Sequence, residues 1–284
     1  MLTSILAASD LSRRSTPAVE RAAQLAGWSG ARLAVLHAVE DDQPAAMVEE
    51  ERRGAAAFLA EQMAGFDKPA GCEIVTRAGD AFQVIADEAE ARAADLIVLG
   101  AHRRQFLRDI FTGTTAERVT RTAGRPVLMA NAAVGARWER VFIATDLSDT
   151  SAHAARTAHA LGILDGAGVT FLHAYAPVTR QMMTHAGISP ERVSDEADRE
   201  FQTTRREVAR FLQTLGLGDL SYSARLIEGM GAEAIAGLVA QARPDLLVLG
   251  TRGLSGVKRL FLGSVTQELM GSLEIDILAV PPKA

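Results

Sequence analysis

The sequence has a single cysteine, Cys72, among 284 residues, so it cannot form an intramolecular disulfide or a zinc site built from cysteines. No apolar run approaches the roughly 20 residues that a membrane-spanning helix needs. Basic residues, 30 in number, do not exceed the 35 acidic ones, and the net charge of -5 disfavours a protein that follows a nucleic-acid backbone. We therefore expect neither a membrane nor a nucleic acid as a partner.

The start of the chain is apolar but short. Met1–Ala8 lacks a basic flank and runs directly into Asp10, which predicts a buried strand rather than a signal peptide, and the expected location is cytoplasmic. Cys72 opens an alternating stretch, Cys72–Arg77, and is predicted to be a half-buried strand residue without a redox role.

The apolar content is sufficient for two compact domains. Hydrophobic residues make up 48% of the chain and charged residues 23%, with no polar stretch long enough to predict a disordered tail. A domain usually has about 100 to 200 residues, so this length indicates two of them.

The sequence contains one pattern twice. The segment VLHA, which contains His37, recurs as FLHA, which contains His173. Asp10 precedes the first histidine by 27 positions, and Asp146 precedes the second by the same 27 positions. Such agreement indicates a duplicated unit.

A later landmark follows the same register. DLIVLG at 95–100 recurs as DLLVLG at 245–250, and Gly79 and Gly229 each precede the closing glycine by 21 positions. The interval from the histidine to that earlier glycine is 42 positions in the first copy and 56 in the second, which predicts a 14-residue insertion. We place it within Pro177–Ser194, followed by a helix from Pro190 onward, and interpret it as either a lid or partner surface or a long connection.

The two copies are predicted to form two domains, 1–133 and 138–284, with a seam at Asn131–Arg137. Each copy alternates apolar runs with longer helical patterns, which is typical of βα units that form a parallel sheet. The expected strands of the first copy are Leu2–Ala8, Leu33–Val39, Glu73–Arg77, Leu96–Leu99 and Val127–Ala130. The expected helices are Thr16–Ser29, Ala46–Gly65, Phe82–Ala93 and Thr114–Gly124. Leu96–Leu99 and Leu246–Leu249 are apolar without alternation, which predicts central strands.

One motif of the second copy indicates phosphate binding. After the strand DLLVLG, Gly250 and Gly253 allow a tight turn, and Gly263 and Ser264 open a helix nine residues later. The first amides of a helix have no backbone partner and carry a partial positive charge, so an anion placed there is stabilised. Lys258 and Arg259 lie in the intervening loop, either near the outer phosphates or simply in solvent.

The arrangement of Gly, two residues, Gly, nine residues, Gly and Ser resembles the ATP-binding motif of the universal stress protein family. The segments IATDLSDTS, FLHA and ILAVP add to this resemblance, which covers nearly all of both halves. It implies two tandem α/β Rossmann-like domains, each a five-stranded parallel sheet in the order 3-2-1-4-5 with helices on both faces. It also implies ATP as the ligand, with which Mg²⁺ could be bound through the phosphates.

The resemblance assigns site roles to matching positions of the second copy. It implies that Asp146 lies near the ribose and adenine, with Thr145 beside it, and that the main chain at Ala174 reads the adenine edge. The positions implied around the ribose and phosphates are Gly250, Gly253, Gly263, Ser264 and Val265.

The first copy departs from the motif. Its weaker candidate residues are Asp10, Ala38, Gly100, Gly113 and Thr114. Arg103 stands where the second glycine is expected, so its side chain either obstructs the path of the phosphates or binds a phosphate itself.

Other polar residues are predicted to have structural roles. His37 and His173 are expected to form local hydrogen bonds beside the crevice. Asp10 and Asp146 are expected to bind ribose or to cap the following helix, and Ser12 and Ser148 are available for the same capping. We identify no metal site, no nucleophile with an adjacent base and no Walker-type loop, and therefore no catalytic residue.

Three functions remain open. The leading hypothesis is an ATP-binding, nucleotide-responsive regulator in stress adaptation, and the alternative is a nucleotide-independent interaction scaffold. A slow ATPase is the third. The family further implies pairing through last strands, so Val127–Ala130 and Ile277–Val280 are expected to join the halves, and a homodimer is expected. The sequence identifies no protein partner.

Overall fold

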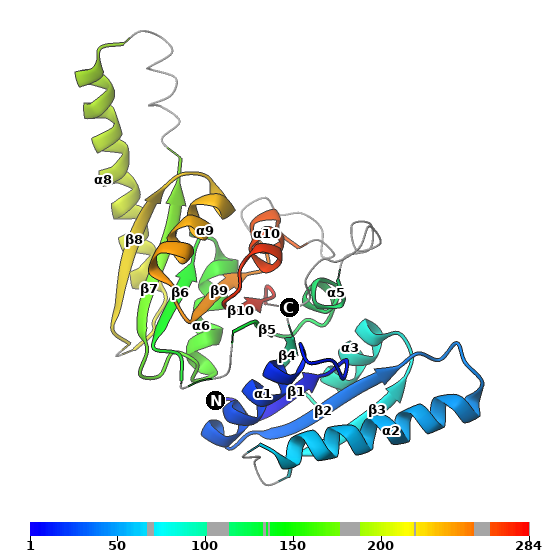
Figure 1. Cartoon of the computed structure of the whole chain (residues 1–284). Coiled ribbons are helices and arrows are strands. Elements are labelled where there is room, and N and C mark those ends of the chain that lie inside the picture. Colours follow the sequence, from blue (N-terminus) through cyan, green and yellow to red (C-terminus); the bar gives the residue numbers. More distant parts are fainter. Residues whose placement is uncertain are drawn as a thin grey trace.

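Two similar sets of alternating strands and helices make up the chain (Figure 1). The computed structural model describes residues 1–66, 71–100, 114–132, 135, 137–176, 188–218, 220–252 and 262–283. In the first half the elements are β1 (Ser4–Ala8), α1 (Thr16–Ser29), β2 (Arg32–Val39), α2 (Ala45–Ala64), β3 (Glu73–Ala78), α3 (Ala81–Ala91), β4 (Leu96–Gly100), α5 (Thr115–Thr122) and β5 (Val127–Ala130). In the second half they are β6 (Arg140–Ala144), α6 (Asp149–Ala160), β7 (Gly168–Tyr175), α8 (Pro190–Thr214), β8 (Tyr222–Glu228), α9 (Gly231–Ala242), β9 (Leu246–Gly250), α10 (Ser264–Ser272) and β10 (Asp276–Val280).

The strands form one ten-stranded sheet in the order β3-β2-β1-β4-β5-β10-β9-β6-β7-β8. Numbered within each half, both sets follow the expected order 3-2-1-4-5, and all pairs inside a half are parallel. The structure differs from the expectation in one detail, because the two five-stranded sheets are continuous. β5 and β10 pair antiparallel, with Leu128 opposite Leu278, so the last strands join the halves as predicted.

Helices cover both faces of the sheet, because alternate side chains of each buried strand point to opposite sides. Ile5 and Ala7 belong to one buried cluster with α1, α2, α6 and α8, whereas Leu6 belongs to the other with α3, α5, α9 and α10. Strands β4 and β9 are almost completely buried, which confirms them as central strands.

The predicted strand around Cys72 begins one residue later. β3 starts at Glu73, and Cys72 lies just before it, partly buried against the first cluster. The predicted role of this residue inside a strand is therefore wrong, although its half-buried environment is confirmed.

The helix predicted after the insertion starts at Pro190 and extends beyond the sheet (Figure 1). Thr204, Val208 and Leu212 recur every four residues and are buried, so the second part of α8 packs against the body of the domain. Residues 177–187 of the predicted insertion lie outside the described residues. Within the described ranges, no helix is long and apolar enough to cross a membrane.

A buried polar cluster connects the halves at the seam. The Asp276 carboxylate of β10 accepts hydrogen bonds from the amides of Asn131 and Ala132, each 3.0 Å long, and from Nε1 of Trp138 at 2.9 Å. Nε of Arg21, on α1, lies 3.3 Å from Asp276 Oδ2 without the alignment of a hydrogen bond. Burial raises the pKa of Asp276 above its usual value, although these donors and the charge of Arg21 act in the opposite direction.

Candidate functional site

Each half has a pocket at the carboxyl ends of its strands, where ligands settle in open parallel sheets. The second-half pocket has a volume of about 360 Å³. The residues that line it are Ala144, Thr145, Asp146, Ser151, Ala174, Gly231, Ile235, Leu249, Gly250, Arg252, Gly263, Ser264, Val265 and Thr266. This set contains every predicted site residue of the second copy except Gly253, which lies outside the described residues.

Two of these glycines are needed for the close approach of neighbouring segments. A Cβ atom on Gly250 would lie 3.1 Å from Cγ2 of Thr150, at the start of α6. A Cβ atom on Gly263 would lie 3.3 Å from the carbonyl oxygen of Thr251. The Gly263 amide donates to that same oxygen at 2.8 Å, so larger side chains at either position would force the loops apart.

The start of α10 leaves backbone donors directed at the pocket. Gly263 is the N-cap residue and no side chain caps the helix, while Ser264 and Val265 occupy its first two positions. The Thr266 hydroxyl donates to the Gly250 oxygen at 2.8 Å, which fixes the helix start against the end of β9. The first amides of α10 are thus available to an anion, and the helix dipole favours negative charge there.

The loop after β6 is held by local hydrogen bonds. Oδ1 of Asp146 accepts from the Ser148 amide at 3.1 Å and from its hydroxyl, and Ser148 in turn caps α6 by accepting from the Ser151 amide. Of the two capping candidates Asp146 and Ser148, the serine therefore caps α6, and Asp146 positions it. Between them Leu147 has a φ of 64°, a strained conformation for a side chain of this size.

The two strand-end histidines have the predicted local partners. Nδ1 of His173 lies 2.9 Å from the carbonyl oxygen of Thr145, and Nδ1 of His37 lies 2.8 Å from that of Ser9. Because a carbonyl oxygen only accepts, each Nδ1 carries the donated hydrogen. Each ring thus connects the end of the second strand to the loop after the first.

Some lining residues were not predicted from the sequence. Gly231 and Ile235 come from α9, and Thr266 is the third residue of α10. Arg252 lies between Gly250 and Gly253 of the motif, and this place in the sequence could have predicted that it lines the pocket. Arg252 brings a positive charge to the pocket beside the open helix start.

The first-half pocket is smaller, at about 230 Å³. Of the candidates in this half, Asp10, Ala38 and Gly100 line it, whereas Thr114 does not. Gly113 and Arg103 lie outside the described residues. Arg14 also lines the pocket, and a Cβ atom on Gly100 would lie 2.9 Å from its backbone oxygen.

Thr114 instead caps α5, as its position at the predicted helix start suggested. Its Oγ1 accepts from the Glu117 amide at 3.2 Å, while Oε2 of Glu117 accepts from the Thr114 amide at 3.2 Å. This reciprocal pair satisfies two donors at the helix start and places a buried carboxylate there. An anion would meet both fewer amides and a like charge in this half.

Neither Asp10 nor Ser12 caps α1, contrary to the expectation. The helix begins at Thr16 with Ser15 as its N-cap, and Asp10 Oδ1 accepts from the Ser12 amide at 3.0 Å. Burial acts to raise the pKa of Asp10, but hydrogen bonds from Ser12 and Ser15 outweigh it and hold this pKa below its usual value. The carboxylate is therefore ionised at neutral pH.

Among the described residues, no group of three or more His, Cys, Asp or Glu side chains is arranged to hold a metal ion.

Comparison with known proteins covers both halves. A model of the universal stress protein family matches residues 1–131 and again residues 137–281. A universal stress protein from Thermus aquaticus is 31% identical over 146 residues, which are 50% of this chain and 98% of that protein. One from Methanocaldococcus jannaschii is 27% identical over 147 residues, 50% of this chain and 82% of that protein.

Solved structures share the fold along the whole chain. The structure of a universal stress protein from Archaeoglobus fulgidus has a TM-score of 0.70 at 17% identity, covering 99% of this chain and 98% of that one. A structure described as a putative universal stress protein from Pseudomonas aeruginosa has a TM-score of 0.64 at 19% identity, with 99% and 94% coverage. With two family matches that together span nearly all of its length, this chain belongs to the universal stress protein family, in a tandem two-domain form.

Proposed function

We propose that the second half binds ATP in its pocket and that the chain acts as a nucleotide-responsive regulator in stress adaptation. The observation that carries this proposal is the uncapped start of α10, which opens on a pocket of about 360 Å³. Pockets for small molecules usually have about 300 to 1,000 Å³, so this volume suits a nucleotide better than the 230 Å³ of the first half.

The lining suggests how ATP would lie. The phosphates belong at the amides of Ser264 and Val265, where the helix start favours anions, with Arg252 as a nearby cation. The ribose and base belong beside Asp146 and Ala174, at the ends of β6 and β7. A carboxylate there can accept a ribose hydroxyl hydrogen, as in other doubly wound folds. Gly253, which the motif also assigns to this site, is part of the proposal.

Mg²⁺ would accompany ATP through the phosphates, since the described part of the chain offers no carboxylate cluster for it. There it would neutralise phosphate charge. The proposal assigns no catalytic residue and includes no hydrolytic step.

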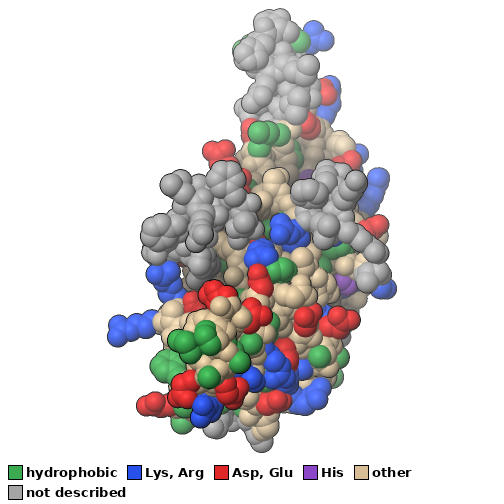
Figure 2. Space-filling model, turned by 90° about the vertical axis from the view of Figure 1, so that its right-hand side faces the viewer, with side chains coloured by type: hydrophobic (Ala, Val, Ile, Leu, Met, Phe, Trp, Pro, Cys, Tyr) green, Lys and Arg blue, Asp and Glu red, His purple; other side chains and the backbone are tan. Residues whose placement is uncertain are grey.

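A scaffold function is supported by a separate observation, and it applies to the first half. Arg14 lines the smaller first-half pocket, and the Glu117 carboxylate binds the Thr114 amide at the start of α5. We propose that this half contributes mainly the partner sheet at β5. The domain limits 1–133 and 138–284 and a homodimer of whole chains remain predictions. Figure 2 shows basic and acidic side chains interspersed over one face of the molecule.

The direct test is to denature the purified protein and to identify any released nucleotide by chromatography and mass spectrometry. ATP should be released from the wild type but not from Gly263→Asp, because the new carboxylate would crowd the Thr251 oxygen and repel phosphate. Gly135→Asp is the matched control, since a Cβ atom there meets nothing within 4 Å.

Protein that arrives empty is titrated with ATP before and after the same substitutions. Equal ATP content or affinity in the wild type and in folded Gly263→Asp, checked by circular dichroism, would refute the proposed site. No binding by the wild type at millimolar ATP would favour the scaffold function for both halves.

A further inference from the structure

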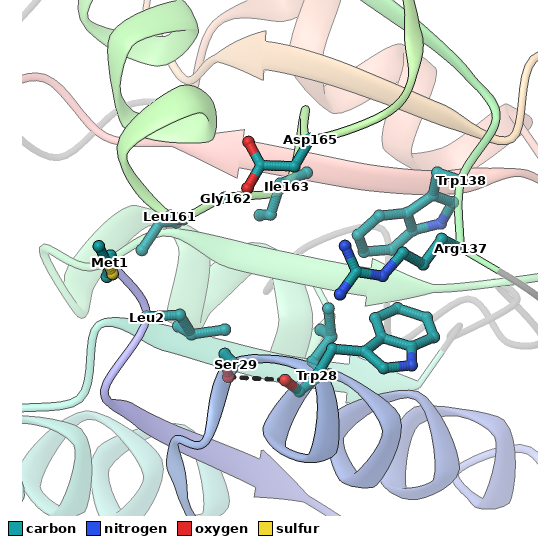
Figure 3. A pocket seen from close by; sticks show the side chains of 11 residues that line it. Met1, Leu2, Trp28, Ser29, Arg137, Trp138, Leu161, Gly162, Ile163 and Asp165 are labelled. Carbon is teal, nitrogen blue, oxygen red and sulfur yellow. Dashed lines mark hydrogen bonds between the residues drawn. The ribbon is translucent and has the colours of Figure 1, made fainter.

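A third cavity lies at the seam, away from the strand ends that form the two pockets described above. It has a volume of about 210 Å³ and opens between the end of α1, the end of α6 and the segments that precede β1 and β6 (Figure 3). Its lining includes Leu2, Leu25, Trp28, Arg137, Trp138 and Asp165. Because these segments precede β1 and β6 or follow α1 and α6, the cavity is at the amino ends of the strands.

Equivalent positions of the two halves meet at this cavity. Leu25 and Leu161 both line it and are 136 positions apart, the same spacing as Asp10 and Asp146. The pair Ser29 and Asp165 and the pair Leu2 and Trp138 have this spacing too. The cavity therefore lies where the antiparallel junction brings the two repeats face to face.

Its chemistry is nevertheless one-sided. By this spacing Trp138 is equivalent to Leu2, Asp165 to Ser29, and the buried Leu164 to Trp28. In each of these pairs, only one of the two residues is aromatic or charged. Trp138 serves the seam through its bond to Asp276, whereas Asp165 takes part in no ion pair among the described residues.

Two opposite charges at the cavity have no charged partner of their own. The guanidinium of Arg137 lies 5.1 Å from the centroid of the Trp28 ring, and Figure 3 shows it projecting between the two indoles, with Asp165 on the α6 side. Within the described chain, neither Arg137 nor Asp165 takes part in an ion pair, and both are exposed. They are available to a ligand, whereas Trp138 is fixed by its bond to Asp276.

The remaining wall of the cavity is apolar. Leu2, Leu25, Leu161 and Ile163 provide aliphatic surface, and Trp28 adds a ring that is 36% exposed. An apolar cavity of about 150 Å³ in another protein is large enough for benzene. A volume of about 210 Å³ therefore suits one ring or one branched aliphatic side chain with a small polar head.

We propose that this cavity binds a free apolar α-amino acid across the seam. The carboxylate pairs with Arg137, the ammonium group pairs with Asp165, and the side chain lies against the aliphatic wall and Trp28. A dipolar ion satisfies both charges, whereas a simple carboxylate would meet Asp165 and a simple amine would meet Arg137. The proposal is independent of nucleotide binding.

The two tryptophans of the chain both line this cavity, so their fluorescence reports on it directly. The protein is titrated with L-leucine and L-phenylalanine, and in parallel with 3-phenylpropanoate and 2-phenylethylamine, which each carry one of the two charges. A saturable change in emission below about 10 mM is expected for the amino acids. The single-charge analogues should bind at least about tenfold more weakly.

Variants of the two charged residues separate this site from non-specific effects. Arg137→Gln and Asp165→Asn should each weaken amino-acid binding at least about tenfold without a change in melting temperature, because both side chains are exposed. Arg192→Gln, which removes a charge from the exposed part of α8, should leave it unchanged.

Three results would overturn the proposal. They are the absence of a saturable change with wild-type protein, equal affinity in the wild type and Arg137→Gln, and displacement of the amino acid by ATP. Displacement by ATP would show that the amino acid binds in a strand-end pocket. The proposal that ATP binds in the second-half pocket would then still stand.

Discussion

The pockets of the two halves have the same position in the fold but different interiors. In the second half about 360 Å³ is open beside an uncapped helix, whereas the first half leaves about 230 Å³ beside a capped one. Both are built on the same strand order, and the loop after the first strand has a positive φ at Leu147 and at Leu11. Both copies have thus kept the same strand order and the same loop conformation, while the residues that line the two pockets differ.

Two substitutions account for part of the difference in space. Gly231 lines the second-half pocket, whereas the equivalent position 150 residues earlier is Ala81 and lines the first. Thr150 packs against Gly250, whereas its equivalent 136 residues earlier is Arg14. A larger side chain at each position reduces the space on the first-half side.

A third substitution changes the charge at the helix start. Glu117 of α5 corresponds to Gln267 of α10, and only the glutamate places a carboxylate at the amides that would meet a phosphate. If ATP binds only in the second half, as proposed, the glycine motif is only one requirement of such a site. Open amides, space and a favourable local charge must also be present together.

The halves differ at the seam as well. Arg21 and Asp276 form a buried contact, but their equivalents are Thr157 and Pro126, which cannot form one. The contact therefore exists once, between α1 of the first half and β10 of the second. It can therefore form between a first half and a second half, but not between two copies of the same half.

The largest expected effect comes from breaking this seam contact. Arg21→Met would leave the Asp276 carboxylate buried without its cation and should lower the free energy of unfolding by about 3 kcal/mol at pH 7. Burial already raises the pKa of Asp276 in the folded state, so its contribution to stability falls as pH rises through that pKa. The loss should therefore shrink as the pH is lowered, in urea unfolding followed by circular dichroism.

The control for this prediction is the double variant Arg21→Met/Asp276→Asn, which removes the buried charge as well. It should regain most of the lost stability at pH 7. A single variant as stable as the wild type at pH 7 would show that the contact does not hold the halves together.

A smaller effect is expected from making the second pocket resemble the first. Gly231 has a φ of 42°, and a Cβ atom there would lie 3.1 Å from Cγ2 of Val265. Gly231→Ala should weaken ATP binding about tenfold, since strain and displacement of Val265 together cost about 1 to 2 kcal/mol. Gly237→Ala in the same helix, where a Cβ atom meets nothing within 4 Å, is the matched control for calorimetric titration.

The smallest effect is expected from making the first pocket resemble the second. Glu117→Gln keeps a side chain that can complete the capping pair but removes its charge, which should strengthen first-half ATP binding about threefold to tenfold. The measurement is made in a Gly263→Asp background, with Glu61→Gln on the exposed side of α2 as a control for net charge. Unchanged affinity would mean that the missing space, rather than the charge, limits the first pocket.

Local patterns predicted the elements well, because their information lies within a few neighbouring residues. The apolar runs at Leu96–Leu99 and Leu246–Leu249 became the central strands β4 and β9. The strand-end residues Asp146 and Ala174 meet Gly250 and Ser264 in one pocket, since parallel strands bring their carboxyl ends to the same edge.

Features that depend on distant residues were not predicted. Gly231 enters its pocket from the start of α9, and Arg21 meets Asp276 only because β5 pairs with β10. The capping pair was within reach, because Thr114 followed three residues later by Glu117 is the sequence signature of that motif. Cys72 and Asp10 show the limit of local patterns, which locate an element more reliably than its first residue.

The most direct test of the difference between the halves is the number of ATP molecules bound per chain, measured by calorimetric titration of nucleotide-free wild-type protein. The account predicts one strong site per chain, which Gly263→Asp abolishes, and far weaker ATP binding in the first half. Two equal sites, or a single site that survives Gly263→Asp in folded protein, would contradict it.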